Sequence, residues 1–400
     1  MVEPDAYFQG ASNILPVSAN PVISYLIKTK LRCMKPRRSR RQFLKDAGKI
    51  SAASIVLPSI PFISCSAQTK ERLGVALVGL GNYSTTMLAK ALTETKRCYL
   101  SGIVTGTPSK AEEWSKKYKI PQKNIYNYNN YDDIANNSDI DIVYVVLPNS
   151  MHAEYSIRAL EAGKHVICEK PMAMNAQEAM QMIETAKKVN RKLSIGYRMH
   201  YDNYFIEAKR LGQSEAFGPV NYLECALGYS FAPEPDSWKV KKAMGGGSLY
   251  NLGVYPIQSA RHAKGKEPIY VTAQATTRRK EIFKEIDETF TWQLEWADGT
   301  LCNSYSGPVA QIDRLFAGCT NGFIEIYPCT PYTGQAGRTS NGPLNFEHVF
   351  QQKLQIDDFA NCVLEDKESI VKGEEGWRDM LIIDAIHKSI KSGKKEKIAV

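Results

Sequence analysis

The stretch Leu73-Gly74-Val75-Ala76-Leu77-Val78-Gly79-Leu80-Gly81-Asn82-Tyr83-Ser84 decides the fold of this 400-residue chain. A continuous apolar run leads into a glycine turn and then into a helical pattern, which predicts a strand, a tight turn and a helix. Gly79 permits the sharp turn, Gly81 lets the backbone approach a pyrophosphate at the helix N-terminus, and Ser84 is the third small residue. A plain tight turn is the alternative. The dinucleotide-binding residues expected here are Gly79, Leu80, Gly81, Asn82 and Tyr83.

Short apolar runs alternate with helical patterns after this turn. The runs are Cys98 to Val104, Ile142 to Leu147, His165 to Cys168 and Leu193 to Tyr197. This alternation predicts an α/β domain over residues 70–197, a Rossmann fold with a doubly wound parallel sheet.

Helix boundaries support the same arrangement. Asn175 followed by Glu178 predicts a capping box for a helix that runs to Lys188, and Gly163 ends the helix before it. Ligands collect at the carboxyl ends of the strands in such sheets. We therefore expect the glycine turn, Pro148-Asn149 and Glu169-Lys170-Pro171 to meet at one crevice.

The end of the second strand bears on the choice between NAD and NADP. An acidic residue about 20 positions past the glycines would bind the ribose 2′-hydroxyl of NAD, but the segment from Val104 to Lys110 contains no carboxylate. Thr105, Ser109 and Lys110 offer hydroxyls and charge to a 2′-phosphate instead. The segment favours NADP over NAD. The alternative makes Ser109 an ordinary helix N-cap and Lys110 a solvated residue of the first turn.

Four motifs together resemble the Gfo/Idh/MocA oxidoreductases, and most of all their glucose-fructose oxidoreductase branch. The resemblance covers nearly everything from residue 72 to the C-terminus. The motifs are Glu169-Lys170-Pro171-Met172, the segment from Gly196 to Asp202, Gly245-Gly246-Gly247-Ser248-Leu249 with Gly253-Val254-Tyr255, and Gly373-Glu374-Glu375-Gly376.

The resemblance implies that Lys170 lies against the nicotinamide and the substrate, and that Tyr255 transfers a proton. A free phenol titrates near ~10, and a neighbouring ammonium favours its anion. Tyr255 would then take a proton from a sugar hydroxyl while hydride leaves the same carbon. The residues alone, without the resemblance, favour a surface tyrosine of a helix for Tyr255 and a solvated lysine at a strand end for Lys170.

Other roles follow from the same resemblance. It implies substrate contacts for Arg198, Tyr201 and Asn251, although the family has aspartate where Asn251 stands, and an amide cannot ionise. Glu169 is expected to orient Lys170 or a ribose, and His152 has a structural alternative. The further cofactor contacts implied are Pro148, Asn149, His152, Glu169, Arg198, Trp238 and Lys239, where Lys239 replaces the more usual arginine.

Residues 198–400 are expected to form a second domain for substrate binding and oligomerisation. Strand-like runs from Val220 to Gly228, Ile269 to Thr277, Thr289 to Trp296, Thr300 to Ser306 and Phe323 to Tyr327 predict an open, mostly antiparallel sheet. Helices are expected at about Phe346 to Leu364 and Gly376 to Ser392, on one face of the sheet. The resemblance implies that the other face joins subunits, as a homodimer or homotetramer.

Residues 1–67 form a leader. Ser39-Arg40-Arg41-Gln42-Phe43-Leu44-Lys45 precedes a mildly apolar stretch, which predicts a twin-arginine export signal and a periplasmic protein. The apolar run is too short for a membrane span. Cleavage after Ala67 is the first expectation and a lipid anchor on Cys65 the second. Residues 1–33 precede Met34 and are treated as an extension.

Charge and cysteine content exclude other classes. Residues 1–69 contain ten Lys or Arg and three acidic residues, a net charge of +7. The whole chain carries +9, which leaves +2 for residues 70–400. No nucleic-acid-binding surface is implied. Seven of the nine cysteines follow the leader, and no Cys-x-x-Cys or histidine cluster predicts a metal site.

Three functions remain open. The main hypothesis is an exported NADP-dependent oxidoreductase of a sugar or sugar derivative. The second is a glycosidase that oxidises its sugar transiently with bound nicotinamide. The third is a non-catalytic sensor of sugar or nucleotide, which Asn251 keeps open. Only Gln68 to Arg72 separate the expected cleavage point from the first strand, so the long arm that traps NADP in glucose-fructose oxidoreductase is absent.

Overall fold

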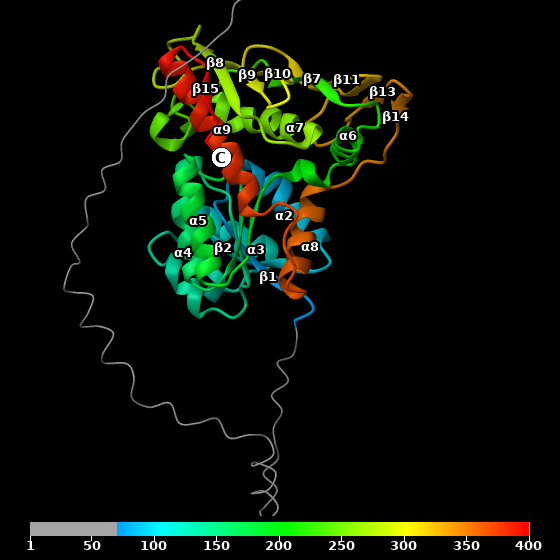
Figure 1. Cartoon of the computed structure of the whole chain (residues 1–400). Coiled ribbons are helices and arrows are strands. Elements are labelled where there is room, and N and C mark those ends of the chain that lie inside the picture. Colours follow the sequence, from blue (N-terminus) through cyan, green and yellow to red (C-terminus); the bar gives the residue numbers. More distant parts are fainter. Residues whose placement is uncertain (1–69, 400) are drawn as a thin grey trace, which may run out of the picture. The chain divides into compact units, whose positions relative to one another are not determined.

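The computed structural model describes residues 70–399. The predicted export signal, Cys65 and the expected cleavage point therefore lie outside the described residues. Within them, two sheets carry the architecture (Figure 1).

The first sheet has six strands in the order β3-β2-β1-β4-β5-β6, and every neighbouring pair is parallel. This confirms the predicted Rossmann domain. Its strands are β1 (Leu73–Val78), β2 (Cys98–Val104), β3 (Ile125–Tyr126), β4 (Ile142–Val145), β5 (His165–Cys168) and β6 (Leu193–Ile195). Its helices are α2 (Ala89–Glu94), α3 (Pro108–Tyr118), α4 (His152–Glu161) and α5 (Ala176–Lys188).

Local signals set the boundaries of these elements. The side chain of Asn175 accepts a hydrogen bond from the Glu178 backbone N–H at 2.9 Å, which caps α5 as predicted. Gly163 follows α4 with φ of 78°, a left-handed conformation that glycine adopts without a steric penalty. Every residue of β1 is buried, as a central parallel strand covered on both faces requires.

The second sheet has nine strands in the order β14-β13-β12-β11-β7-β10-β9-β8-β15. Only β7 and β10 pair in parallel, so the prediction of a mostly antiparallel sheet is confirmed. Its strands are β7 (Val220–Gly228), β8 (Tyr270–Thr276), β9 (Thr289–Glu295), β10 (Leu301–Gly307), β11 (Ile312–Cys319), β12 (Gly322–Ile326), β13 (Gly337–Thr339), β14 (Gly342–Leu344) and β15 (Glu396–Lys397).

Strand β11 was not predicted, because charged and small residues interrupt its apolar pattern. The neighbouring strands satisfy its central charge. Arg314 pairs with Glu224 on β7 at 3.0 Å and with Glu325 on β12 at 2.7 Å. A charge that looks unsuited to a strand is thus compensated by β12, the next strand in the chain, and by β7, which is distant in sequence.

Helices α6 (Asn203–Gln213), α7 (Val254–Lys264) and α9 (Gly373–Ser392) lie between the nine-stranded sheet and the first domain (Figure 1). The helix predicted from Gly376 therefore starts three residues earlier. Neither α6 nor α7 was predicted as an element. Helix α7 matters most here, because it carries Tyr255.

Helix α8 (Gln351–Leu364) leaves the second domain and packs on the first, although it lies within the predicted second domain of residues 198–400. Ile356 and Phe359 are fully buried in the same cluster as β1, β2 and α2. The Asp357 carboxylate accepts the backbone N–H groups of Lys96 and Arg97 at 2.8–3.0 Å, just after α2 ends. The core of the first domain is therefore completed by a segment near the C-terminus.

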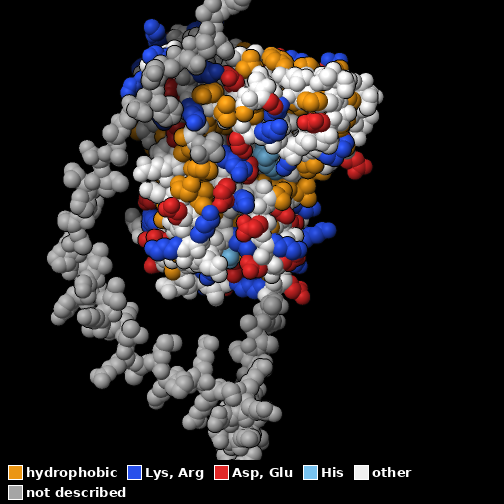
Figure 2. Space-filling view, viewed as in Figure 1, with side chains coloured by type: hydrophobic (Ala, Val, Ile, Leu, Met, Phe, Trp, Pro, Cys, Tyr) orange, Lys and Arg blue, Asp and Glu red, His pale blue; other side chains and the backbone are white. Residues whose placement is uncertain are grey.

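On the face of the described residues that Figure 2 shows, acidic and basic side chains are interspersed and form no large patch of one charge. In residues 70–399 we find no helix with the length and apolar character that a membrane crossing needs.

We predict that Phe359→Ala lowers the free energy of unfolding by about 3–5 kcal/mol, since it leaves a cavity in a fully buried site. Chemical denaturation followed by circular dichroism measures this. Leu354→Ala is the control on the same helix, because Leu354 is 40% exposed, and it should change stability by no more than ~0.5 kcal/mol. Equal losses in the two variants would contradict the packing of α8 on the first domain.

Candidate active site

A cavity of about 880 Å³ lies where the carboxyl ends of the parallel strands face the second domain. This is at the upper end of the range for small-molecule sites, ~300–1,000 Å³. The three turns expected to converge do so: the glycine turn, Pro148-Asn149 and Glu169-Lys170 all line it. The second domain contributes Tyr229, Phe231, Pro233, Trp238, Lys239, Gly247, Ser248, Asn251, Leu252, Tyr255, Phe283, Pro308 and Tyr332.

The glycine turn has the geometry that a diphosphate needs. Gly79 has φ of 93°, and a Cβ there would lie 2.4 Å from the Val146 carbonyl oxygen, so only glycine fits. A Cβ at Gly81 would meet no atom within 4 Å. The space over Gly81 is therefore open toward the cavity, as close approach of a ligand to this backbone requires. Leu80, Asn82 and Tyr83 line the cavity beside it.

The far end of the cavity is lined by Thr105, Gly106, Thr107, Lys110 and Tyr128. The Lys110 ammonium donates a hydrogen bond to the Leu80 carbonyl at 3.0 Å, which holds it across the mouth of the glycine turn. Tyr128 follows β3, and no local motif in the sequence marked it.

Ser109, one of the expected cofactor contacts, lies outside the cavity lining. Helix α3 begins at Pro108 with Thr107 at the N-cap position, so Ser109 is an exposed residue of the first turn and does not line the cavity. Its alternative role as the N-cap also fails, because Thr107 holds that position.

Lys170 and Tyr255 meet in the cavity from opposite domains. The Lys170 ammonium lies 4.7 Å from the centroid of the Tyr255 ring and donates to the Asn251 backbone carbonyl at 2.9 Å. Lys170 follows β5, whereas Tyr255 is in the first turn of α7 after the π-helical turn Leu249–Gly253. The spatial arrangement that the resemblance implied is therefore present.

The environment of Tyr255 favours its phenolate. Burial raises the pKa of the phenol, but the charges of Arg198 and Lys170 lower it by more, and the net pKa lies below its ordinary value. The Arg198 guanidinium carbon is 5.4 Å from the Tyr255 ring centroid. Two cations, one from each side of the domain boundary at residue 197, thus act on one phenol.

The resemblance implies substrate contacts for Arg198 and Tyr201, and both side chains are buried. Neither lines the cavity. The buried Arg198 guanidinium donates to the Gln351 side chain and to the Thr330 carbonyl, and the Tyr201 hydroxyl donates to Asp358 at 2.8 Å. The short helical turn Arg198–Tyr201 packs against α8, where Gln351 binds Arg198 and Asp358 binds Tyr201. The Arg198 guanidinium still lies against the rings of Tyr255 and Tyr332, which line the cavity.

Glu169 is a buried carboxyl beneath Lys170. It accepts a hydrogen bond from the Tyr144 hydroxyl at 2.8 Å and from the Lys170 backbone N–H at 3.2 Å. Burial raises the pKa of Glu169. A Cβ at Gly196 would lie 2.5 Å from its Oε1, so a glycine there leaves room for this carboxyl. The geometry fits the expected orienting role.

Asn149 and His152 brace the loops of the cavity. Asn149 donates to the Gly245 carbonyl at 2.7 Å. The two ring nitrogens of His152 lie 2.7 and 2.9 Å from the carbonyl oxygens of Pro171 and Leu147, and burial lowers the pKa of the ring. His152 therefore ties the loops after β4 and β5 together, which agrees with its structural alternative, while both residues also line the cavity.

Asn251 lies one helical turn before Tyr255 on the cavity wall. Its side-chain amide donates to the Gly247 carbonyl at 2.9 Å, and its backbone carbonyl accepts a hydrogen bond from the Lys170 ammonium. The main chain of Asn251 thus positions Lys170 whatever side chain stands there.

Comparison with known proteins agrees with this geometry. Residues 73–197 match the model of the oxidoreductase family with an NAD-binding Rossmann fold, and residues 205–325 match the GFO/IDH/MocA C-terminal domain. The chain belongs to the Gfo/Idh/MocA oxidoreductase family. It is an NAD(P)-dependent oxidoreductase, and the open glycine turn is where the cofactor would be held.

Several relatives are similar along most of the chain. The crystal structure of aldose-aldose oxidoreductase from Caulobacter crescentus, complexed with glycerol, is 36% identical and has a TM-score of 0.79, with 82% of this chain and 99% of that chain covered. D-xylose 1-dehydrogenase [NADP(+)] of Haloarcula marismortui is 26% identical over 80% of this chain and 92% of that protein. Trans-1,2-dihydrobenzene-1,2-diol dehydrogenase of Xenopus tropicalis is 28% identical over 65% of this chain and 80% of that protein.

We predict that the phenol of Tyr255 titrates below its ordinary pKa of ~10 and that Lys170→Met raises this pKa, since one of the two stabilising charges is lost. The difference in tyrosinate absorbance between each protein and its Tyr255→Phe derivative isolates this single group. Lys239→Met is the matched control, because Lys239 also lines the cavity but does not contribute to the Tyr255 shift. A pKa that Lys170→Met leaves in place would contradict the assignment.

Proposed function

We propose that this protein transfers hydride between a hydroxyl-bearing carbon of a sugar and a nicotinamide cofactor, with Tyr255 as the general acid and base. The observation that carries the proposal is the contact of the Lys170 ammonium with the Tyr255 ring in a cavity that also holds the glycine turn. A sugar substrate is supported by the names of two relatives, an aldose-aldose oxidoreductase and a xylose dehydrogenase.

The cofactor transfers the hydride in this proposal, and protein side chains transfer the proton. When bound, the nicotinamide supplies the hydride acceptor or donor. The Tyr255 phenolate accepts the proton of the reacting hydroxyl, and Lys170 and Arg198 favour that phenolate by charge. In the opposite direction the Tyr255 phenol returns a proton to the developing alkoxide.

Oxidation of one sugar and reduction of a second by the same cofactor is the cycle that we favour. The support is the aldose-aldose relative, which is 36% identical over 82% of this chain. Such a cycle needs no fresh cofactor, which suits the exported location proposed from the twin-arginine motif at Ser39 to Lys45. Fractionation of cells with an antibody to the protein locates it, and a wholly cytosolic protein would contradict export.

We predict that Tyr255→Phe lowers kcat by about 10²–10⁴-fold, because the proton-transfer group is lost, and leaves cofactor affinity near that of the wild type. Stopped-flow kinetics with aldoses measures the first and fluorescence titration the second. Tyr250→Phe is the control one turn away, since its hydroxyl donates to the Met174 carbonyl and does not line the cavity.

Full turnover in Tyr255→Phe would exclude the proton-transfer role. Release of nitrophenol from glycosides by the wild type would indicate the glycosidase alternative instead, and binding of sugar without either reaction would indicate a sensor.

For the cofactor we propose NADP over NAD. The support is the absence of a carboxylate after β2, the place of Lys110 beside the glycine turn, and the NADP(+) named for the xylose dehydrogenase. We predict that Lys110→Ala weakens NADP binding by about tenfold or more, the value of one charged hydrogen bond, and NAD binding much less. Lys116→Ala, on the same helix and facing solvent, is the control. An equal loss for both dinucleotides would contradict a 2′-phosphate contact.

A further inference from the structure

Three exposed aromatic side chains gather at the cavity, and the Lys170–Tyr255 chemistry does not use them. Tyr229, Phe231 and Tyr332 are 42%, 36% and 42% exposed, and all three line the cavity. The rings of Tyr229 and Phe231 lie 5.4 Å apart between centroids. Large apolar side chains grouped in one open hollow mark a ligand surface more often than a chance exposure.

The backbone under Phe231 is held by an arginine fork. Arg279, from the loop between β8 and β9, donates to the Phe231 carbonyl at 3.0 Å and to the Pro308 carbonyl at 3.1 Å. The Phe231 N–H in turn donates to the Pro308 carbonyl at 3.3 Å. The segments that contain Phe231, Arg279 and Pro308 are thus hydrogen-bonded to one another at the backbone of Phe231.

A buried carboxylate anchors that fork. Glu288 has no exposed surface and pairs with the Arg279 guanidinium. It also accepts the backbone N–H groups of Arg278 at 2.8 Å and Arg279 at 3.2 Å. Burial raises the pKa of Glu288, but these donors lower it by more, so the carboxylate stays charged. Breaking a pair that includes a buried carboxylate is costly, and the backbone that carries Phe231 is therefore held in place.

The aromatic surface continues to the reacting pair. The Arg198 guanidinium carbon lies 4.6 Å from the ring centroid of Tyr332 and 5.4 Å from that of Tyr255. Tyr332 also stacks with Tyr83 of the glycine turn, with centroids 6.4 Å apart. A ligand whose reacting carbon lies at Tyr255 therefore has aromatic rings beside it on the path to solvent.

The chemistry of this surface suits a pyranose ring. A pyranose has apolar C–H faces and hydroxyls around its edge. Flat aromatic rings cover the faces, and the tyrosine hydroxyls offer hydrogen bonds at the edge. We propose that Tyr229, Phe231 and Tyr332 form a second sugar subsite, so that the substrate class is a di- or oligosaccharide whose terminal aldose reacts at Lys170 and Tyr255. This inference rests on the proposed function, which supplies the reacting sugar.

The test compares one sugar ring with two. We would measure kcat/KM for glucose and for cellobiose and maltose in the wild type and in Tyr229→Ala, Phe231→Ala and Arg279→Ala. The expected result is a disaccharide-to-glucose ratio that falls at least tenfold in each variant. Tyr327→Ala is the control, since Tyr327 is 54% exposed but does not line the cavity, and its ratio should equal that of the wild type.

Two outcomes would overturn the subsite. One is a ratio that none of the three variants changes. The other is an equal loss for glucose and disaccharides together with weaker NADP binding, which would assign the rings to the cofactor or to the reacting sugar.

Calorimetric binding separates this inference from the proposed function. If the wild type turns over no sugar, the oxidoreductase proposal fails. The subsite is then judged by cellobiose binding alone, which should still exceed glucose binding and weaken at least tenfold in Phe231→Ala. Equal binding of the two sugars would overturn it.

Discussion

Two cations held against one phenol are the constraint on which the site depends. Lys170 and Arg198 repel each other, and burial adds to the cost of each charge. Hydrogen bonds offset part of this cost: Lys170 donates to the Asn251 carbonyl, and Arg198 donates to the Thr330 carbonyl and the Gln351 side chain. All of these acceptors lie beyond residue 198, so the charge that Lys170 brings from the first domain to Tyr255 is stabilised by the second domain.

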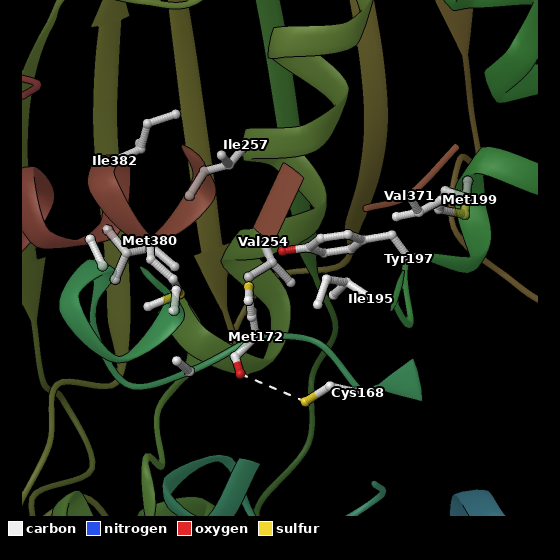
Figure 3. Packing of buried hydrophobic residues seen from close by; sticks show 14 of the residues in the cluster. Cys168, Met172, Ile195, Tyr197, Met199, Val254, Ile257, Val371, Met380 and Ile382 are labelled. Atoms are coloured by element: carbon white, nitrogen blue, oxygen red, sulfur yellow. Dashed lines mark hydrogen bonds between the residues drawn. The ribbon is translucent and has the colours of Figure 1, made fainter. Parts of the chain in front are cut away.

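The place of the phenol is set by how α7 is buried. Val254 and Ile257 of α7 pack with Met172, just after Lys170, and with Met380 of α9 (Figure 3). Further along α7, Arg261 pairs with the fully buried Asp379 at 2.6 Å, and Gln258 donates to the same carboxylate at 2.6 Å. Burial raises the pKa of Asp379, whereas Arg261 and Gln258 lower it. Apolar packing at one end of α7 and this ion pair at the other leave Tyr255 little freedom to move.

The sequence predicted the first domain well, because its strands are continuous apolar runs with clear turns between them. It predicted the second domain only in part, because α7 and β11 were not recognised. Helix α7 buries Arg261 and His262 where an amphipathic helix would have apolar residues, and β11 contains Arg314. Lys170 and Tyr255 were found through the resemblance. Arg198, Tyr201 and Ser109 do not line the cavity, and their roles stay predictions, since neighbours distant in sequence decide where a polar side chain points. Tyr128, Phe231 and Tyr332 were missed because no local pattern marks a ring that lines a cavity.

The crossing of α8 back to the first domain also bears on how the protein is made. Residues 73–195 supply all six parallel strands, yet Ile356 and Phe359 fill the gap beside α2 only after most of the remaining chain has been translated. Domains generally fold as units in the order of their synthesis. Here the half that leaves the ribosome first keeps an uncovered apolar face until nearly the end of translation, and chaperones or proteases meet that face before helix α8 does.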